Sequence, residues 1–352
     1  MRPGNIPKNN NFDLIRLLLS LTVFFVHSYD LSRNPGLSVI PVFLNSHTAV
    51  CAFFVISGFL VSSSFANSTT PKDYFSKRIR RVFPGYVVVV LLCGLIGFAF
   101  SEYPYREYFS FPLFQFLWAN LSLLNFIQPS LPGVFTDNGV QAVNGALWTI
   151  RFELLFYLIV PLFFLLTKRF RGGLIFFLAF LTPLIFRIVS VRLLQGQPEN
   201  QLVTSLSYYL PILFIAFVSG AFLYFYFGEF RQHALLFVMV AVVGYVTARI
   251  SGLSIISPFF LSVIVIYLAF GFPYLGNTGK YGDLSYGIYI WHFPVLQVMI
   301  AQGFFKENPL LPLLSATLIV TLLAFLSWHT IEKPFLRRSS HYRLASDKKH
   351  VI

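Results

Sequence analysis

The amino-acid sequence predicts an all-α polytopic membrane protein with about ten transmembrane helices and an additional re-entrant or interfacial segment. Of its 352 residues, 56% are hydrophobic and only 11% are charged, whereas a soluble domain carries about 25% charged residues. Apolar runs long enough to cross a bilayer, about 17–25 residues each, recur along the chain. Lys and Arg gather in every second connection between these runs, which is the bias that orients membrane proteins.

The predicted spans follow one another with mostly short connections. In order they are 12–29, 48–66, 84–101, 147–166, 174–193, 207–227, 234–250, 254–272, 285–303 and 311–329. The connections on one side are basic, and those on the other side hold only Arg33, Arg106 and Lys306. Because cytoplasmic connections carry the excess of Lys and Arg, we expect both termini in the cytoplasm. The whole chain, 1–352, is expected to form one integral membrane domain with a short basic tail, 333–352.

A second kind of apolar segment lies in the long outer connection. If 111–127 crossed the membrane, every later helix would invert and the basic stretch 168–173 would face outward, against the charge bias. We therefore expect 111–127 to be re-entrant or to lie along the outer surface. The stretch 128–146 is rich in Pro, Gly and Asn and predicts irregular backbone that shapes an outer substrate mouth.

The first span carries two ionisable residues, Arg16 and His27. Eleven residues at about 100° each end about 20° past three full turns, so both side chains lie on one helix face, roughly 16 Å apart along the axis. A lone Arg near a helix end usually reaches the headgroups, and a lone His is often a packing residue. Their shared face favours a functional pair, because ionisable groups in spans generally face a protein interior or a wet cavity.

A basic cluster precedes the third span. Lys77, Arg78, Arg80 and Arg81 crowd its predicted start, and Pro84 is expected near the first helical turn. Arginines at such a place bind phosphates through bidentate hydrogen bonds, aided by the helix N-terminus. The alternative is an ordinary cytoplasmic anchor that touches lipid headgroups.

The fourth span opens with Trp148, Arg151 and Glu153. Glu153 is the only acidic residue expected well inside a span, and intramembrane acids generally have a partner or a task. Arg151 is a candidate partner, although residues i and i+2 point to different sides of a helix, so a cross-helix partner stays open. A purely structural ion pair is the alternative interpretation.

The ninth and tenth spans add further polar residues. Ser285, Tyr289 and His292 recur at i, i+4 and i+7, which predicts one polar stripe, either functional or a set of interhelical hydrogen bonds. We expect His292 in the inner half of its span, nearer the level of Arg16 than of His27. Glu332, at the end of the tenth span, is expected at the same inner membrane face as Arg78 and Arg81 and to brace these arginines.

Taken together, these blocks resemble the acyltransferase 3 family of membrane acyltransferases. The matching pieces are FDLIRLLLSLTVFFVH, FFVISGFL, YFSKRIRRVFPGY, ALWTIRFELLFYLIVPL, LSYGIYIWHFPV and IEKPF. The resemblance implies a ten-helix enzyme of the bacterial inner membrane that moves acyl groups, most often acetyl, from cytosolic acyl-CoA to glycans at the outer face. It implies no fused extracytoplasmic hydrolase-like domain on this chain.

The same resemblance implies roles for individual residues. His27 is implied as the catalytic residue, Arg16 as essential beside it, and Arg78 and Arg81 as contacts of the CoA phosphates. The chain departs from the family pattern at the fourth span, where Leu154 stands in place of the second acid of a Glu-Glu pair.

The expected reaction is transfer of an acyl group to a sugar hydroxyl, with the neutral His27 imidazole as general base. A covalent acyl-histidine, or an acyl group carried by Ser20 or Ser28, is a less favoured alternative. The donor that stabilises the carbonyl oxygen in the transition state stays unassigned. Expected partners are acyl-CoA, a glycan or lipid-linked glycan acceptor and membrane lipids.

Other functional classes fit the sequence less well. Nucleic-acid binding is not needed to explain the net charge of +13, because basic cytoplasmic connections account for it. No metal site is expected, since Cys51 and Cys93 lie in apolar runs without ligand spacing. A transporter or flippase would use the buried His, Arg and Glu as a path. However, the chain shows no internal repeat of the kind that transporters commonly have.

Overall fold

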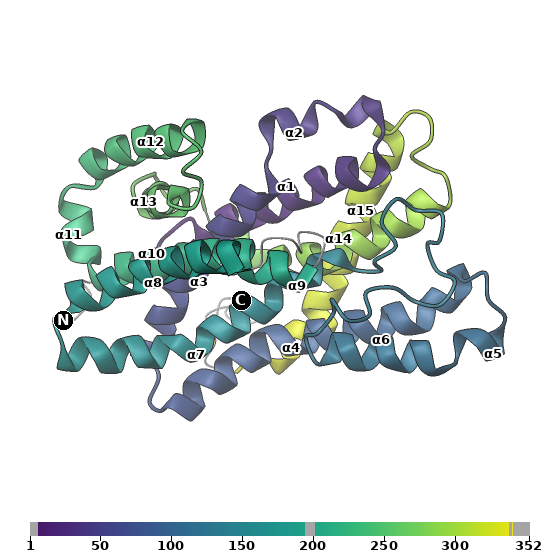
Figure 1. Ribbon diagram of the computed structural model, residues 1–352, viewed down its shortest axis with the longest axis horizontal. Coiled ribbons are helices and arrows are strands. Elements are labelled where there is room, and N and C mark those ends of the chain that lie inside the picture. The colour runs from purple at the N-terminus through teal and green to yellow at the C-terminus, as the bar shows by residue number, and fades with distance from the viewer. Residues whose placement is uncertain (1–5, 194–200, 277, 338–339, 341–352) are drawn as a thin grey trace, which may run out of the picture. The chain divides into compact units, whose positions relative to one another are not determined.

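The protein is built of helices. The computed structural model describes residues 6–193, 201–276, 278–337 and 340, and this part of the chain contains no β-strand. Among these described residues, eight helical stretches are long and apolar enough to cross a membrane. Their helices are α1 (Phe12–Ser32), α3 (Ser46–Ala66), α4 (Pro71–Ile96), α7 (Trp148–Arg169), α8 (Gly172–Leu193), α10 (Leu210–Phe225), α14 (Leu284–Ala301) and α15 (Leu310–Ser327) (Figure 1).

Two shorter apolar helices, α12 (Ala234–Ile250) and α13 (Ser257–Phe270), complete the set. Each of the ten predicted spans therefore coincides with one helix, and the all-α polytopic membrane fold is confirmed. Short helices lie in the connections, namely α2 (Ile40–Phe43), α5 (Tyr105–Tyr108), α9 (Gln201–Thr204) and α11 (Phe227–Gln232), and the short α16 (Lys333–Phe335) follows α15.

The helix α6 (Phe111–Leu121) occupies the extra apolar segment. Its 11 residues measure roughly 16 Å, about half of the 30 Å needed to cross the hydrocarbon core. The following residues, up to the 3₁₀ turn Gly145–Leu147, contain no helix, as the Pro, Gly and Asn content predicted. Phe135 adopts a left-handed backbone with φ +58° there, which is uncommon for a bulky residue.

The prediction for the start of α4 was wrong. The helix begins at Pro71, so the basic cluster lies inside it and Pro84 lies well within it. The Thr70 hydroxyl accepts a hydrogen bond from the Asp73 backbone N–H at 3.1 Å, and proline is favoured at the first helical position. The sequence did not predict this start, because residues 72–81 are rich in charges and the apolar residues that indicate a span begin only after them.

The helices form two compact units. The first comprises Met1–Ile15, Val50–Phe75 and Phe152–Gly276. In it α10 contacts α8 and α13, and α12 pairs with α13. A Cβ at Gly58 would lie 2.0 Å from the Phe217 carbonyl oxygen, and one at Gly220 would lie 2.0 Å from that of Val55. The backbones of α3 and α10 therefore touch at these two glycines.

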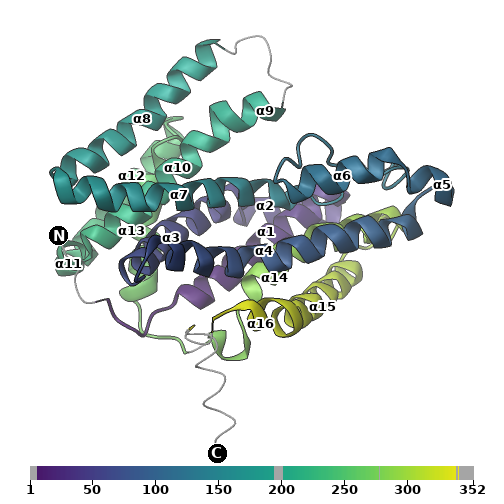
Figure 2. The same cartoon turned by 90° about the horizontal axis from the view of Figure 1, so that it is seen from below.

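The second unit comprises Arg16–Ala49, Ser76–Arg151 and Asn277–Ile352. It contains most of α1 and α4, the segment around α6, and α14 packed along α15 (Figure 2). Ile288 and Leu296 of α14 share a buried core with Phe24 of α1 and Val320 of α15. The prediction of a single membrane domain over 1–352 is not tested by this division and stays a prediction.

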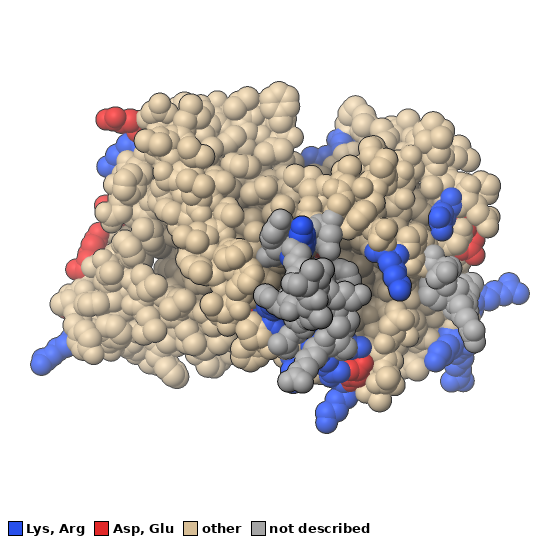
Figure 3. All heavy atoms as spheres, turned by 180° about the vertical axis from the view of Figure 1, so that it is seen from behind, with Lys and Arg blue, Asp and Glu red and all other residues tan. Residues whose placement is uncertain are grey.

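The outer surface of the helices is largely apolar. On the face in Figure 3, Lys, Arg, Asp and Glu gather at a few places with broad uncharged stretches between them. Along α7 the exposed side chains include Leu155, Leu158, Leu162 and Leu165, which recur at helical spacing on one side. An exposed row of leucine side chains of this kind is suited to contact with lipid and not with water.

Candidate functional site

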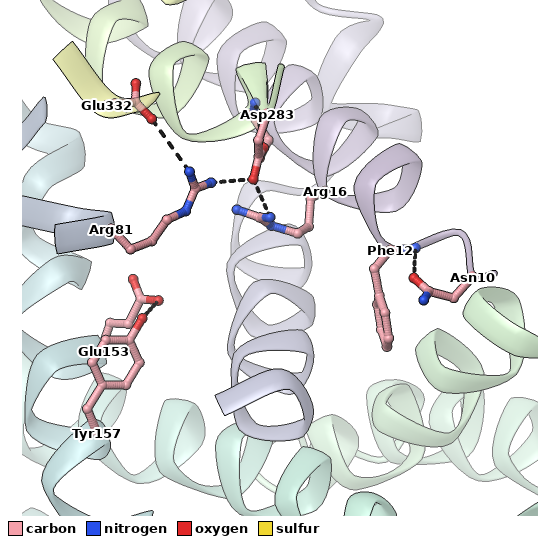
Figure 4. Close-up of polar contacts among 9 residues, drawn as sticks. Asn10, Phe12, Arg16, Arg81, Glu153, Tyr157, Asp283 and Glu332 are labelled. Carbon is pink, nitrogen blue, oxygen red and sulfur yellow. Dashed lines mark hydrogen bonds and ion pairs between the residues drawn. The ribbon is translucent and has the colours of Figure 1, made fainter. Parts of the chain in front are cut away.

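The first cluster of the site is a carboxylate between two arginines. Asp283 Oδ2 lies 2.5 Å from Arg16 Nη1 and also accepts a hydrogen bond from Arg81 Nη2 (Figure 4). The Asp283 side chain is 2% exposed, against 17% for Arg16 and 13% for Arg81. Buried charges of this kind are stable only when paired, and one carboxylate here joins α1, α4 and the start of α14.

Local backbone chemistry fixes Asp283 at that place. It is the N-cap of α14, where it accepts hydrogen bonds from the Ser285 N–H at 3.3 Å and the Ser285 hydroxyl at 2.5 Å. Gly282 has φ +119°, and a Cβ there would lie 2.4 Å from the Trp328 ring, so only glycine fits. Burial acts to raise the pKa of the Asp283 carboxyl, but Arg16, Arg81 and Ser285 outweigh it and hold that pKa below its usual range.

A second carboxylate, Glu332, completes this charge cluster. Its Oε2 lies 3.8 Å from Arg81 Nη1, and its Oε1 accepts from the Ser327 hydroxyl at 3.0 Å. The π-helical turn Trp328–Glu332 turns it inward, and π turns are often found at functional sites. The Arg81 guanidinium also lies 5.2 Å from the centroid of the Trp328 ring. The predicted contact of Glu332 with the arginines is therefore present, at Arg81.

The position of these arginines corrects one prediction. Arg78 and Arg81 lie within α4 and not at its first turn, so the helix N-terminus does not contribute to anion binding at them. Arg78 is half-buried. It stands three residues before Arg81, on the same side of the helix.

The second cluster is a pair of histidines. His27 Nδ1 of α1 lies 2.8 Å from His292 Nε2 of α14. The ring centroids are 5.1 Å apart and the ring planes differ by 24°, so the rings meet edge to edge in nearly one plane. The Phe293 ring packs against His27 at 5.6 Å with an interplanar angle of 81°. His292 is fully buried, whereas His27 is partly exposed.

The prediction that His292 lies nearer the level of Arg16 was wrong. From Arg16 to His27 α1 rises about 16 Å, and from Asp283 to His292 α14 rises about 13 Å. Because Asp283 is bonded to Arg16, the two helices run in the same direction from a shared starting level. The histidines therefore meet at the other end, where the sequence spacing already placed His27.

The three residues of the polar stripe on α14 bond to different partners. Ser285 bonds Asp283, and His292 bonds His27. The Tyr289 hydroxyl donates to the Ala146 carbonyl at 3.0 Å and lies 2.7 Å from the Thr149 hydroxyl. The stripe was predicted correctly as a face of α14, but its members belong to different parts of the site.

Comparison with known proteins decides the family of this chain. Residues 9–329 match the model of the acyltransferase domain of the acyltransferase 3 family. The chain belongs to this family. No solved structure matches it.

Several relatives cover almost the whole acyltransferase. An O-acetyl transferase of Shigella phage Sf6 is 30% identical over 95% of this chain and 98% of its own length. Nodulation protein 10 of Rhizobium leguminosarum bv. viciae is 28% identical over 93% of each chain. The exopolysaccharide production protein ExoZ of Rhizobium meliloti (strain 1021) is 24% identical over 84% of this chain and 92% of its own length.

Glu153 of the acyltransferase lies in the first compact unit. Its Oε1 accepts hydrogen bonds from the Tyr157 hydroxyl and, at 3.3 Å, from the Ser57 hydroxyl of α3 (Figure 4). The cross-helix partner that the sequence left open is thus Ser57. The Arg151 guanidinium lies 4.9 Å from the Phe126 ring centroid. Trp148, the first residue of α7, is half-buried.

The irregular stretch after α6 is hydrogen-bonded to α14 on both sides of His292. Gln297 Nε2 donates to the carbonyls of Val140 and Ala142, both at 2.6 Å. Asn138 donates to Gln297 Oε1 at 2.9 Å, and Asn144 donates to the Ile290 carbonyl at 2.9 Å. These buried amides hold an otherwise irregular backbone against the helix that carries His292.

Sequence reasoning missed three of these residues. Asp283 had a readable signal, since an acid directly before an apolar helix is a strong N-cap candidate. Asn144 and Gln297 had none, because a single amide does not indicate which backbone groups it will meet. All three act by joining segments that lie far apart in the sequence.

Proposed function

We propose that this acyltransferase transfers an acetyl group from cytosolic acetyl-CoA to a hydroxyl of a cell-envelope or exported polysaccharide at the outer face of the membrane. The observation that carries the proposal is the arrangement of two residues on one face of α1. Arg16 lies in a buried charge cluster, and the partly exposed His27 lies about 16 Å further along the helix. Two relatives, an O-acetyl transferase and an exopolysaccharide production protein, support acetyl as the transferred group and a polysaccharide as the acceptor.

Arg78 and Arg81 are the proposed contacts of the CoA phosphates. Guanidinium groups bind phosphate oxygens through paired hydrogen bonds. Asp283 and Glu332 hold Arg81 in one orientation, and Arg78 precedes it by one turn of α4. From this end of the unit the pantetheine arm would reach toward His27, about 16 Å along α1.

His27 is the proposed general base. The acceptor hydroxyl attacks the thioester carbonyl while its proton passes to the His27 imidazole. The C–S bond then breaks, and the proton leaves with the thiolate as free CoA. General-base catalysis of this kind contributes about 10²–10⁴-fold to the rate. The products are the acetyl ester and CoA, and His27 returns to its starting state.

Direct transfer is favoured over an acyl-serine. Ser20 and Ser28 are fully buried, and each hydroxyl donates inside α1, to the Leu17 carbonyl at 2.8 Å and to the Phe25 carbonyl at 2.6 Å. A hydroxyl engaged in this way is a poor nucleophile, because attack requires release of the bond and access to the donor.

The orientation in a bacterial inner membrane is part of the proposal. The positive connections, among them 67–83 and 167–173, would face the cytoplasm. Both termini would then be cytoplasmic, the arginine cluster would face the acyl-CoA pool, and His27 would lie toward the acceptor side.

The test measures CoA release and polysaccharide acetylation by the purified protein in nanodiscs. We expect acceptor-dependent CoA release by the wild type, a loss of about 10²–10⁴-fold with His27→Gln, and a raised KM for acetyl-CoA with Arg78→Gln. His233→Gln is the matched control, because His233 is exposed at the start of α12. Wild-type rates with His27→Gln would exclude the base role. Absence of acetyl-CoA binding and turnover in every protein would instead favour a transporter.

A further inference from the structure

The partners of His292 settle the positions of the protons on both rings. His292 Nδ1 lies 3.1 Å from the Ile288 carbonyl oxygen. A carbonyl oxygen only accepts hydrogen bonds, so Nδ1 carries the proton. A neutral imidazole has a single N–H, and therefore His292 Nε2 holds a lone pair.

The same reasoning passes from His292 to His27. The lone pair of His292 Nε2 faces His27 Nδ1 at 2.8 Å, so His27 Nδ1 is the donor of this hydrogen bond. His27 then has its lone pair on Nε2, and within the described part of the chain no hydrogen bond is made to that atom. We propose that His292 is a positioning residue that fixes His27 in the Nδ1–H tautomer and leaves Nε2 as its basic atom.

The surroundings favour the neutral rings that this argument uses. His292 is fully buried, and its ring is contacted by Phe24 at 6.3 Å, by Tyr289 at 6.0 Å and by Phe293 at 6.3 Å between centroids. An apolar pocket disfavours an unpaired cationic imidazolium, and two cationic rings joined at 2.8 Å would repel each other. The chain of hydrogen bonds therefore runs in one direction, from His27 through His292 to the backbone of α14.

The orientation of the His27 ring is fixed as well as its tautomer. The hydrogen bond to His292 holds one edge, and the Phe293 ring packs against the His27 ring in a T-shaped contact, with 5.6 Å between the centroids. Phe293 is itself confined, because a Cβ at Gly145 would lie 2.7 Å from its Cζ atom. The segment before α7 therefore packs at Gly145 against Phe293, and Phe293 packs against His27.

This inference rests on the proposed role of His27 as general base. In the opposite tautomer His27 would present an N–H to the acceptor hydroxyl and could not take its proton. In the fixed tautomer Nε2 takes the proton, and the imidazolium that forms still donates from Nδ1 to the His292 lone pair. That bond to a charged donor is stronger than the bond in the resting state, so His292 stabilises the transition state more than the ground state.

Two variants of His292 separate hydrogen bonding from packing. In His292→Gln the Oε1 atom can accept from His27 Nδ1–H near the place of Nε2, whereas His292→Leu fills the space without an acceptor. We expect kcat of the Leu variant to fall by about 10–100-fold, the usual cost of losing such a supporting partner, with KM for acetyl-CoA unchanged. The Gln variant is expected to recover most of that loss. Equal kcat of wild type and Leu variant, or equal losses in both variants when both are folded, would overturn the inference.

A spectroscopic measurement decides the tautomer independently of turnover. The imidazole ¹⁵N shifts of protein labelled at histidine, reconstituted in lipid, distinguish protonated from unprotonated ring nitrogens, and His27→Gln assigns the signals among the seven histidines. We expect an unprotonated Nε2 and a protonated Nδ1 at His27, with a mixture of tautomers in His292→Leu. A protonated Nε2 in the wild type would refute the inference. If the wild type transfers no acetyl group, the proposed function fails, while these shifts still test the tautomer.

Discussion

The charge cluster depends most on a single residue, Asp283. Two guanidinium groups, those of Arg16 and Arg81, share its carboxylate, and Glu332 Oε2 lies 3.8 Å from Arg81 Nη1. Asp283 therefore contacts both arginines. Removing one partner of a buried pair is costly because the other charge stays buried without compensation.

We therefore expect Asp283→Asn to destabilise the protein by about 3–5 kcal/mol, the usual cost of breaking a buried ion pair. The measurement is thermal unfolding of the purified protein in detergent. Asp137→Asn is the matched control, because Asp137 is exposed in the irregular stretch after α6 and should leave the melting temperature unchanged. An equal, small shift in both variants would mean that Asp283 does not hold the arginines together.

The pH dependence of this effect has a defined sign. Arg16 and Arg81 hold the pKa of Asp283 below its usual range, so its stabilisation is complete above the unfolded value of about 3.9 and is lost only as the pH falls through the lower folded value. The difference in melting temperature between wild type and Asp283→Asn should narrow as the pH falls below about 4. A difference that stays unchanged down to about pH 3 would contradict the assignment.

At the scale of single residues, the sequence predicted which functional residues share a helix face, but not which residues they would contact. The spacing placed Arg16 and His27 on one side of α1, and that side does meet α14 at both residues. The sequence could not indicate that Asp283 and His292 supply the partners. Helical periodicity shows which residues share a face, but the neighbour of that face is decided by tertiary packing.

At the scale of helices, the apolar runs were enough to locate every span in the described chain. They failed at α4, whose first half is basic and begins at a proline. Hydropathy detects the part of a helix that suits lipid, whereas the helix itself continues as long as capping and backbone geometry allow.

The crossing of α3 and α10 makes a sharp prediction about one glycine. A Cβ at Gly58 would lie 2.0 Å from the Phe217 carbonyl oxygen, and close contacts between membrane helices depend on small residues at this kind of position. Gly58→Ala should therefore force the helices apart, at a cost above the 1–3 kcal/mol or so of ordinary overpacking. We expect a lower melting temperature and a low yield of monodisperse protein. Gly173→Ala is the control, because no atom lies within 4 Å of a Cβ there.

The fastening of the irregular stretch to α14 can be tested at Gln297. Gln297→Leu removes the two hydrogen bonds to the carbonyls of Val140 and Ala142 and the one that Gln297 accepts from Asn138, together worth about 2–4 kcal/mol. We expect faster amide hydrogen exchange confined to residues 128–147. Gln302→Leu, at the exposed end of α14, should leave that exchange unchanged. Unchanged protection in Gln297→Leu would show that the stretch is held by other contacts.

At the scale of the whole molecule, composition and charge predicted the fold class, and the ordered motifs indicated the family. The residues that build the site come from α1, α4, α14 and the end of α15. Their convergence is a property of the folded unit. In the sequence such residues are only isolated charges within apolar runs, and nothing there indicates which of them will contact one another.

The orientation of the molecule is open to a direct test on either side of α7. In a background of Cys51→Ala and Cys93→Ala, which removes both cysteines, a cysteine is introduced by Asp137→Cys or by Lys168→Cys. Because α7 separates these positions and α6 is too short to cross, they should lie on opposite sides of the membrane. A membrane-impermeant maleimide added to intact cells is expected to label the first variant, and the second only after the membrane is opened, as the positive charge at 168–171 requires. The reverse pattern would place the arginine cluster outside, away from the acyl-CoA pool, and the proposed direction of transfer would have to be abandoned.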